Sequence, residues 1–478
     1  MKPTTPVRSN NQHQGNDRRA TQTARSSAED ENFRSCFART ADWEASCGSW
    51  RVVNASPGDH PLIHQFLVSV FRRPSPAEFQ AQLEEPSYEP RDRLLIRDEG
   101  RIAGHVRLIN RDMRFGDLVL PVGMITDLAT RPEYQGQGCA SALLSAACQT
   151  LVQDGAVLAL LATNQPHFYA RRGWVVNGRH CYSASAPRKI LSYLKQREAE
   201  VNGLLDPLPP PHAHKQYNIR LWRHVERAPV MRLYEERTQA GYGSLVRPEA
   251  YWRWLLSRWG KQRIYIAIDG PDRLDMDQSL APIVAYAAAR DGRIVELMSS
   301  DAHPEAGVQL LARACQDAIE QDFCRVRLDA PPGEPLHPVM VRAGGEHQHA
   351  EADQGMVHMA RLLQPRRFLN IMSERLTRRA DEAGLPKPCQ LGLLVNKKKY
   401  QLSLNQHGLN LAAGQLGRSY LSCAPALVPQ LLLGHVDVRD AVESGRAKPS
   451  THIALETAKI LFPRHPLWHP PWDNLPAE

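Results

Sequence analysis

Arg131-Pro-Glu-Tyr-Gln-Gly-Gln-Gly-Cys-Ala140 is the most informative part of this chain of 478 residues, and it follows a predicted strand at 122–130. Gly136 and Gly138 carry no side chain, so their backbone N–H groups can face a bound group and can adopt positive φ. A helix that starts here adds unpaired N–H donors and the positive end of its dipole. The segment therefore predicts a diphosphate-binding loop, and a glycine turn that caps a helix is the structural alternative.

The residues around this loop predict a mixed α/β layer. Apolar residues recur at helical spacing directly after it, at 140, 143, 144, 147 and 151. A continuous apolar run at 156–162 then predicts a strand buried on both faces. Upstream, runs at 94–97 and 102–109 flank Asp98-Glu99-Gly100, which is typical of a hairpin turn. This order of elements favours strands and helices packed in layers.

Composition divides the chain into several units. Residues 1–48 are polar and lack apolar periodicity, which predicts a disordered tail. The first α/β unit is expected at 49–205, and a proline-rich linker at 206–216. The second unit, 217–345, repeats the element order of the first. The last unit, 356–478, begins with an amphipathic helix, followed by alternating strands and further helices.

The polar, histidine-containing stretch 333–355 is expected to be a linker between the second and third units. It includes Glu346-His-Gln-His349, whose side chains are of the metal-binding type. Because a linker offers no rigid frame, no metal site is expected.

Charge and cysteine content exclude several classes of protein. The formal charge of +8 favours anionic ligands, but no basic face with interleaved aromatics indicates a nucleic-acid partner. Nine scattered cysteines without a C-x-x-C pair indicate reduced thiols and argue against both a disulfide framework and a structural zinc site. No run of about 18 apolar residues predicts membrane insertion, and the first residues lack a signal-peptide core, so we expect a cytoplasmic location.

A second motif, His167-Phe-Tyr-Ala-Arg-Arg-Gly-Trp174, follows the strand predicted at 156–162. The loop also fits the pattern Gln/Arg-x-x-Gly-x-Gly/Ala, through Gln135, Gly138 and Ala140. Together the two motifs resemble those of the GNAT N-acetyltransferases. The resemblance implies acetyl-CoA as acyl donor, a primary amine as acceptor and Tyr169 as general acid; a core tyrosine packed under Trp174 is the alternative.

Acyl transfer from a thioester requires the donor to lie extended, with its diphosphate on the loop and its pantetheine on a strand edge. Developing oxyanion charge needs a backbone N–H from the same segment, and the leaving thiolate needs a proton. Asn164 and Gln165 follow the buried strand, where a plain turn is the alternative to ligand binding. The residues assigned to acetyl-CoA are Leu128, Ala129, Thr130, Gln135, Gly136, Gln137, Gly138, Cys139, Ala140, Ser141, Asn164 and Gln165. Cys139 begins a helix, where its pKa could fall, and we expect a contact near the diphosphate rather than a nucleophile.

Over residues 49–478 the chain resembles the enhanced-intracellular-survival (Eis) acetyltransferases. That family combines an active acetyltransferase domain, a degenerate second copy and a sterol-carrier-protein-like C-terminal domain. The resemblance implies two tandem mixed-sheet domains, a sterol-carrier-like α+β domain and a ring-like homo-oligomer, a hexamer. Here Gln135, Gly136 and Gln137 replace the family's arginine-rich loop. In the second unit Asp301-Ala-His-Pro-Glu305 takes the place of the loop, and its acidic residues should prevent CoA binding.

In the same family the C-terminal carboxylate acts as general base, which here implies Glu478. The family tail often ends in an aromatic residue, and a frayed terminus is the alternative. Asp127 and Glu133 are rival bases. The function predicted is transfer of an acetyl group to an aminoglycoside, a polyamine or a lysine side chain. The alternatives are a lipid or acyl-CoA carrier acting through 356–478 and a non-catalytic acetyl-CoA sensor.

Overall fold

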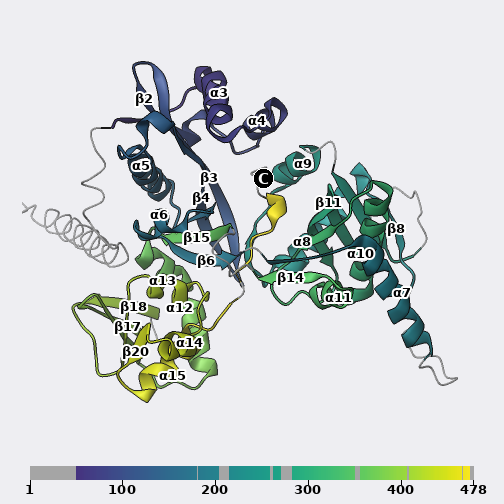
Figure 1. Ribbon diagram of the computed structural model, residues 1–478. Helices are drawn as coiled ribbons and strands as arrows, with labels where there is room; N and C mark the ends of the chain where they lie inside the picture. Colours follow the sequence, from purple (N-terminus) through teal and green to yellow (C-terminus); the bar gives the residue numbers. More distant parts are fainter. Residues whose placement is uncertain are drawn as a thin grey trace, which may run out of the picture.

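The computed structural model describes residues 50–179, 181–203, 215–258, 262–270, 282–349, 356–405, 408–465 and 467–473. The predicted tail at 1–48, the proline-rich part of the linker and Glu478 lie outside these residues. Within the described part, the strands form three sheets, shown in Figure 1. No described helix is long and apolar enough to cross a membrane.

The first sheet has the order β1-β2-β3-β4-β5-β15-β6, and β9 pairs with β3. Only β4 and β5 are parallel to each other, and the other neighbours are antiparallel. The strands are β1 (Val52–Asn54), β2 (Arg93–Asp98), β3 (Arg101–Phe115), β4 (Leu118–Thr130), β5 (Leu158–Thr163), β6 (Val175–Arg179), β9 (Tyr242–Leu245) and β15 (Val357–Leu362). Its helices are α3 (His60–Phe71), α4 (Pro76–Leu83), α5 (Cys139–Gln153) and α6 (Pro166–Ala170), with 3-10 turns at Pro57–Asp59, Pro90–Asp92 and Pro132–Tyr134.

The second sheet has the order β14-β7-β13-β12-β11-β10-β8. It repeats the pairing of the first sheet, because only its central pair, β12 and β13, is parallel. The strands are β7 (Cys181–Ser185), β8 (Asn218–Leu221), β10 (Arg263–Ile268), β11 (Ile283–Arg290), β12 (Arg293–Ser299), β13 (Val326–Asp329) and β14 (Glu346–His349). Its helices are α7 (Pro187–Gly203), α8 (Arg227–Thr238), α9 (Glu249–Ser257), α10 (Pro304–Glu320) and α11 (Leu336–Arg342), with a 3-10 turn at His224–Glu226.

The first two sheets exchange strands across the domain limits expected from the sequence. β7 follows β6 along the chain but lies in the second sheet, antiparallel to β13. β15 comes after the second unit but lies in the first sheet, antiparallel to β5. The two units are thereby joined through backbone hydrogen bonds as well as through side-chain contacts, while the domain limits themselves stay a prediction.

The third sheet has the order β18-β17-β16-β19-β20, and the chain then returns to the other two sheets. In Figure 1 this return is the yellow segment that runs back between the first and second sheets. Its strands are β16 (Cys389–Val395), β17 (Lys398–Asn405), β18 (Gly408–Ala413), β19 (Tyr420–Cys423) and β20 (Ala447–Pro449). Its helices are α12 (Pro365–Glu382), α13 (Leu427–Leu432), α14 (Val438–Glu443) and α15 (His452–Leu461). The last described element, in the C-terminal tail that follows α15, is a 3-10 turn at Pro471–Asp473.

Local sequence signals account for the elements around the loop. The predicted hairpin is confirmed: Glu99 has φ 46° and Gly100 has φ 80°, the two positive values that a tight turn of this kind needs. The predicted helix after the loop is α5, whose residues Leu143, Leu144 and Leu151 are fully buried against the sheet.

The expectation of a linker at 333–355 is wrong for most of its described part. α11 lies at Leu336–Arg342, and β14 pairs with β7 along Glu346–His349. β14 is an edge strand of its sheet, where one row of backbone groups and many side chains face solvent. Its polar sequence therefore resembles a linker although its backbone is in a sheet.

Candidate functional site

The glycine loop connects β4 to α5 and has the backbone geometry that an anion site needs. Gly136 has φ 77°, and Gly138 has φ 86° as the residue that precedes α5. The space beside Gly136 where a side chain would begin is open. The Trp50 indole N–H donates to the carbonyl oxygen of Gln137 at 2.8 Å. As in any α-helix, the first N–H groups of α5 have no partner within the helix, and here they lie beside a loop held in a left-handed turn.

β4 and β5 separate next to this loop. They pair in parallel from Val122–Leu158 to Met124–Leu160, and this ladder ends there, although β4 continues to Thr130. The backbone of the last residues of β4 is therefore available on the β5 side for a ligand that pairs with it like an added strand. Thr130 also carries a buried hydroxyl oxygen that has no hydrogen-bond partner within the described residues.

A cavity of about 1430 Å³ opens between the separated strands, α5, α6, α9 and the tail. Drug-sized ligands occupy cavities of roughly 300–1,000 Å³, so there is room for a larger donor and an acceptor together. The predicted site residues that line it are Leu128, Ala129, Thr130, Gln135, Gly136, Gln137, Gly138, Cys139, Ala140, Ser141, Asn164, Gln165 and Tyr169. Their assigned roles stay predictions. Gln165 also forms the turn into α6, where its N–H donates to the Thr163 hydroxyl at 3.0 Å, as the turn alternative requires.

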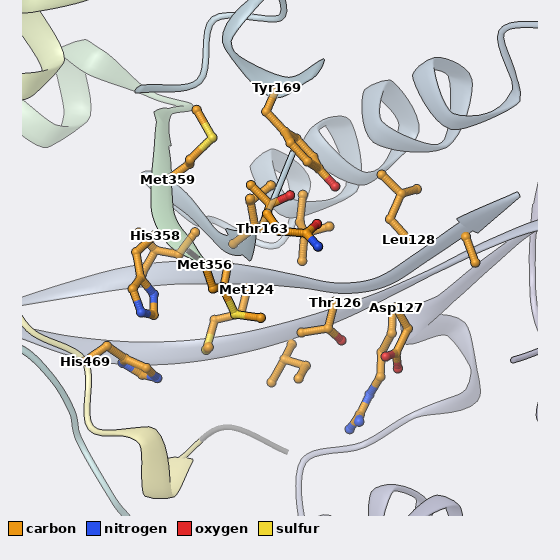
Figure 2. A pocket seen from close by; sticks show the side chains of 18 of the residues that line it. Met124, Thr126, Asp127, Leu128, Thr163, Tyr169, Met356, His358, Met359 and His469 are labelled. Carbon is orange, nitrogen blue, oxygen red and sulfur yellow. The ribbon is translucent and has the colours of Figure 1, made fainter. Parts of the chain in front are cut away.

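Tyr169 projects from α6 into this cavity, with its hydroxyl toward Thr163 and Leu128 (Figure 2). Burial raises the pKa of Tyr169 to about 12, against the lowering effects of Arg172 and of a hydrogen bond with Thr163. The ring also contacts Trp174 edge to face, with centroids 6.1 Å apart. Tyr169 thus packs on Trp174, as the core alternative expects, while its hydroxyl stays protonated at neutral pH and lines the cavity.

Cys139 does not have the lowered pKa that its position at the start of α5 suggested. Its side chain is 1% exposed, and burial raises the pKa of the thiol. The loss of hydration thus raises the pKa of this thiol by more than the helix N-terminus lowers it. At the same helix start, the Ser141 hydroxyl accepts hydrogen bonds from the Arg172 guanidinium, which brings a cation to the loop side of the cavity.

Asp127 lines the cavity at a bulge in β4 and has φ 52°, which is uncommon for a residue other than glycine. Its carbonyl oxygen accepts a hydrogen bond from His105 Nδ1 at 2.9 Å. Burial lowers the pKa of His105 well below its ordinary value, which keeps that ring neutral. The other rival base, Glu133, is exposed and is not among the described residues that line the cavity.

The tail reaches the cavity through a buried ion cluster. Arg247 Nη2 donates to Asp473 at 2.7 Å and to Glu296 at 2.6 Å, and all three side chains are fully buried. Burial raises the pKa of Glu296. Burial acts in the same direction on Asp473, but the attraction of Arg247 outweighs it, and the pKa of Asp473 lies below its ordinary value. The tail is therefore anchored at Asp473, whereas Glu478 lies outside the described residues.

Comparison with known proteins agrees with this geometry. The sequence profile of the family described as an acetyltransferase (GNAT) domain matches residues 51–176. An uncharacterized N-acetyltransferase of Mycobacterium tuberculosis is 32% identical over 117 residues, which cover 23% of this chain and 69% of that protein, and one of Mycobacterium bovis matches equally well. The chain belongs to the GNAT acetyltransferase family. It is an acyltransferase enzyme, and acetyl-CoA is its expected donor.

Solved structures resemble this GNAT chain over most of its length. A GCN5-related N-acetyltransferase from Kribbella flavida aligns with a TM-score of 0.63 at 15% identity, covering 89% of this chain and 98% of that one. One from Anabaena variabilis has the same TM-score and identity, covering 88% and 99%. Eis1 from Mycobacterium abscessus aligns with a TM-score of 0.55 at 14% identity, covering 87% and 98%. These likenesses concern the fold alone.

Several cavity residues of this GNAT enzyme were not predicted from its sequence. Met356, His358 and Met359 come from or next to β15, and Trp468 and His469 come from the tail (Figure 2 labels all but Trp468). Burial along β15 does not alternate strictly, so residues 357–362 carry only a weak strand signal. Nothing local indicates that this strand inserts next to β5.

Proposed function

We propose that this enzyme transfers an acetyl group from acetyl-CoA to a primary amine by direct attack, with Tyr169 as the general acid. The observation that carries the proposal is the shared cavity: the left-handed glycine loop at the start of α5 and the Tyr169 hydroxyl line the same space. This cavity lies at the first sheet and not in the third. We therefore prefer the transferase to the lipid or acyl-CoA carrier.

The residues present fit acetyl-CoA. Its diphosphate would lie on the N–H groups of 136–141, and its pantetheine amides would pair with the open edge of β4 at 128–130. Arg172 adds positive charge beside the helix start. The thioester would then lie deeper, between β4 and α6, where Tyr169 projects.

Tyr169 is suited to act on the departing sulfur. A free thiol ionises near pH 8.5, so a phenol of pKa about 12 is the weaker acid, and complete proton transfer to the sulfur is unfavourable. The phenol therefore contributes most as a hydrogen bond that strengthens while sulfur gains charge; the product thiol then forms with the phenol proton, and the phenolate regains a proton from solvent. Backbone N–H groups near the β4 bulge are proposed to stabilise the oxyanion.

The base that receives the amine proton is proposed to be the carboxylate of Glu478. Support comes from the tail, whose residues 467–469 and 471–473 line the cavity and are held there by Arg247. Asp127 is the competing base, because it also lines the cavity. A C-terminal extension that lowers kcat at least tenfold while Asp127→Asn keeps wild-type turnover would favour Glu478, and the reverse pattern would favour Asp127.

The charges along the cavity wall favour an acceptor amine with one positive charge. The carboxylates that line the cavity are Glu78, Glu85, Asp127, Asp291 and Asp473. Glu85 is already paired with Arg107 at 2.6 Å. Asp473 is paired with Arg247 at 2.7 Å. The arginines that line the same cavity are Arg73, Arg107, Arg111, Arg172, Arg290 and Arg293. A polyamine or aminoglycoside would thus meet a wall whose charges nearly cancel and which offers little net attraction to several positive charges. A lysine side chain or an apolar monoamine carries only one positive charge that needs a partner.

A thiol-release assay with acetyl-CoA tests both statements. Polyamines, aminoglycosides, lysine peptides and aromatic monoamines are compared at equal concentration. We expect release of CoA that depends on an amine, with the highest kcat/KM for singly charged acceptors. Absence of amine-dependent release across all four classes would contradict the transferase, and a preference for polycations would contradict the acceptor class.

The other units are proposed to support this site. The second unit, which shares the pairing of the first sheet, is proposed to be a degenerate acetyltransferase copy that does not bind CoA. The third is proposed to be sterol-carrier-like, and the assembly a homo-hexamer. Light scattering on the purified chain measures the mass, and a monomer would contradict the ring.

A further inference from the structure

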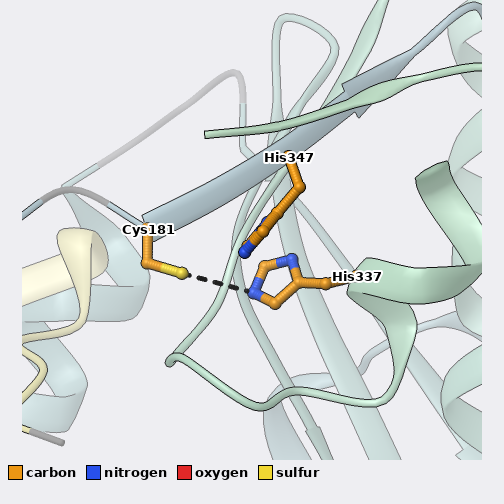
Figure 3. Close-up of side chains that lie close together, drawn as sticks. All are labelled: Cys181, His337 and His347. Carbon is orange, nitrogen blue, oxygen red and sulfur yellow. Dashed lines mark hydrogen bonds between the residues drawn. The ribbon is translucent and has the colours of Figure 1, made fainter. Parts of the chain in front are cut away.

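Three potential metal ligands converge at the edge of the second sheet (Figure 3), and none of them lines the acetyl-transfer cavity. Cys181 comes from β7, His337 from α11 and His347 from β14. One ligand atom from each residue lies within 4.8 Å of the others. The three positions are far apart in sequence, so the fold and not a local motif brings them together.

The spacing of Cys181 and His337 is already that of two ligands of one zinc ion. Zinc binds thiolate sulfur at about 2.3 Å and imidazole nitrogen at about 2.0–2.1 Å, and tetrahedral angles then place sulfur and nitrogen about 3.6 Å apart. Cys181 Sγ and His337 Nε2 are 3.6 Å apart. His337 Nε2 also lies 3.2 Å from the carbonyl oxygen of Pro331, which can only accept, so an ion at this site would replace the proton that this nitrogen donates.

Ser183 holds both imidazole rings in place. Its hydroxyl is 2.8 Å from Nδ1 of His337 and 3.0 Å from Nδ1 of His347. The ring centroids of the two histidines are 4.4 Å apart. A hydrogen bond to the other ring nitrogen is the usual way in which proteins orient a metal-binding histidine.

Burial separates an inner from an outer side of the cluster. Cys181 and His337 are buried, with 1% and 4% exposure, whereas His347 is exposed. An ion can therefore enter beside His347 and keep a water as its fourth ligand. Burial raises the pKa of the Cys181 thiol to about 11, with Asp329 adding to the shift, so binding displaces a proton from sulfur to solvent.

We propose that Cys181, His337 and His347 form a binding site for Zn²⁺ that fixes the strand exchange between the first two sheets. One thiolate and two imidazoles are the donor set that Zn²⁺ favours over Mg²⁺ or Ca²⁺. β7 directly follows β6, and β14 precedes β15, so the site joins the two strands through which the chain passes from one sheet to the other. It is independent of the proposed acetyl transfer.

The test uses the full chain and Zn²⁺ alone, with metal content measured after dialysis. We expect about one Zn²⁺ per chain in the wild type, and loss of it in Cys181→Ser and in His347→Ala, each of which removes a ligand. Ser183→Ala should weaken binding about 10–100-fold. Matched controls are Cys324→Ser and His452→Ala, exposed residues outside the cluster, which should retain the wild-type content.

Cobalt substitution supplies a second readout. Co²⁺ bound to the wild type should show a thiolate-to-metal charge-transfer band that Cys181→Ser lacks, while circular dichroism confirms that the variants are folded. A wild-type chain that retains no Zn²⁺ and shows no such band would overturn the proposal. Equal metal content in wild type, Cys181→Ser and His347→Ala would also overturn it, because the ion would then be adventitious.

Discussion

Each of the first two sheets has one parallel strand pair, β4–β5 and β12–β13, and the first strand of each pair leads into a helix. The N-termini of these two helices differ in chemistry although the strand pairing around them is alike. β4 leads to α5 through Gly136 and Gly138 in left-handed conformations, with no acidic residue in the first turn. β12 leads to α10, which begins at Pro304 and has Glu305 in its first turn. Proline removes one N–H donor, and the glutamate places a negative charge where a diphosphate would lie. The same sheet pairing thus precedes a helix start suited to an anion in one unit and a helix start unsuited to an anion in the other.

A second difference lies in the helix that follows the next strand of each unit. The helix after β5 is α6, which carries Tyr169, and the helix after β13 is α11, which carries His337. In the first unit this position serves the cavity. In the second unit it belongs to the cysteine–histidine cluster, so a few residues at equivalent elements determine what each unit can do.

The largest effect on this comparison is expected from Tyr169→Phe. Loss of the hydroxyl removes the proton donor and should lower kcat about 10²–10⁴-fold, with little change in acetyl-CoA affinity. The matched control is Tyr265→Phe in the second sheet, whose buried hydroxyl has no hydrogen-bond partner in the described structure. Steady-state kinetics measure both variants. Wild-type turnover in Tyr169→Phe would remove the assignment.

The dependence of kcat on pH tests the same role of Tyr169. The phenol must be protonated to donate, and its raised pKa of about 12 moves the loss of activity to high pH. We therefore expect no decline in kcat from Tyr169 between pH 7 and 10. A limb in this range that disappears in Tyr169→Phe would contradict the raised pKa.

The packing of the C-terminal tail should depend strongly on Arg247, which links the tail to the second sheet. Arg247→Ala leaves the carboxylates of Glu296 and Asp473 buried without their cation and should lower the free energy of unfolding by about 3–5 kcal/mol. Arg91→Ala breaks an exposed pair with Glu89 and should cost about 0–1 kcal/mol. Urea denaturation compares them, and equal costs would show that the tail anchor is not a stabilising cluster.

The loop backbone can be tested at Gly138. A β-branched residue at φ 86° is strained by about 1–2 kcal/mol or more, so Gly138→Val should weaken acetyl-CoA binding about tenfold or more. Gly333→Val introduces comparable strain at φ 89° in the second unit and should leave the affinity unchanged. Isothermal titration calorimetry measures both. Equal losses would mean that the effect is global destabilisation.

The smallest effect concerns charge. Gln137→Asp gives the loop an acidic residue like that of the second unit and should weaken acetyl-CoA binding about two- to fivefold at low salt. Gln137→Asn preserves neutrality and should bind as the wild type does. If both variants weaken binding equally, the side chain and not its charge is responsible.

The sequence predicted best what depends on neighbouring residues. The hairpin at Glu99-Gly100, helix α5 and the loop follow from turn chemistry and helical spacing, which act within a few residues. The exchange of β7 and β15 was not predicted, because strand partners are chosen by contacts between distant parts of the chain. β14 was taken for a linker because an edge strand with solvent-facing side chains lacks an apolar pattern. The pKa of Cys139 was misjudged because burial, which opposes the helix dipole, is invisible in local sequence.

The most direct test of the central claim is a crystal structure of the chain with CoA. The account predicts the diphosphate on the backbone N–H groups of 136–141, with the pantetheine along β4 and its sulfur near Tyr169. A diphosphate bound at the start of α10, or a glycine loop that is closed to the nucleotide, would contradict it.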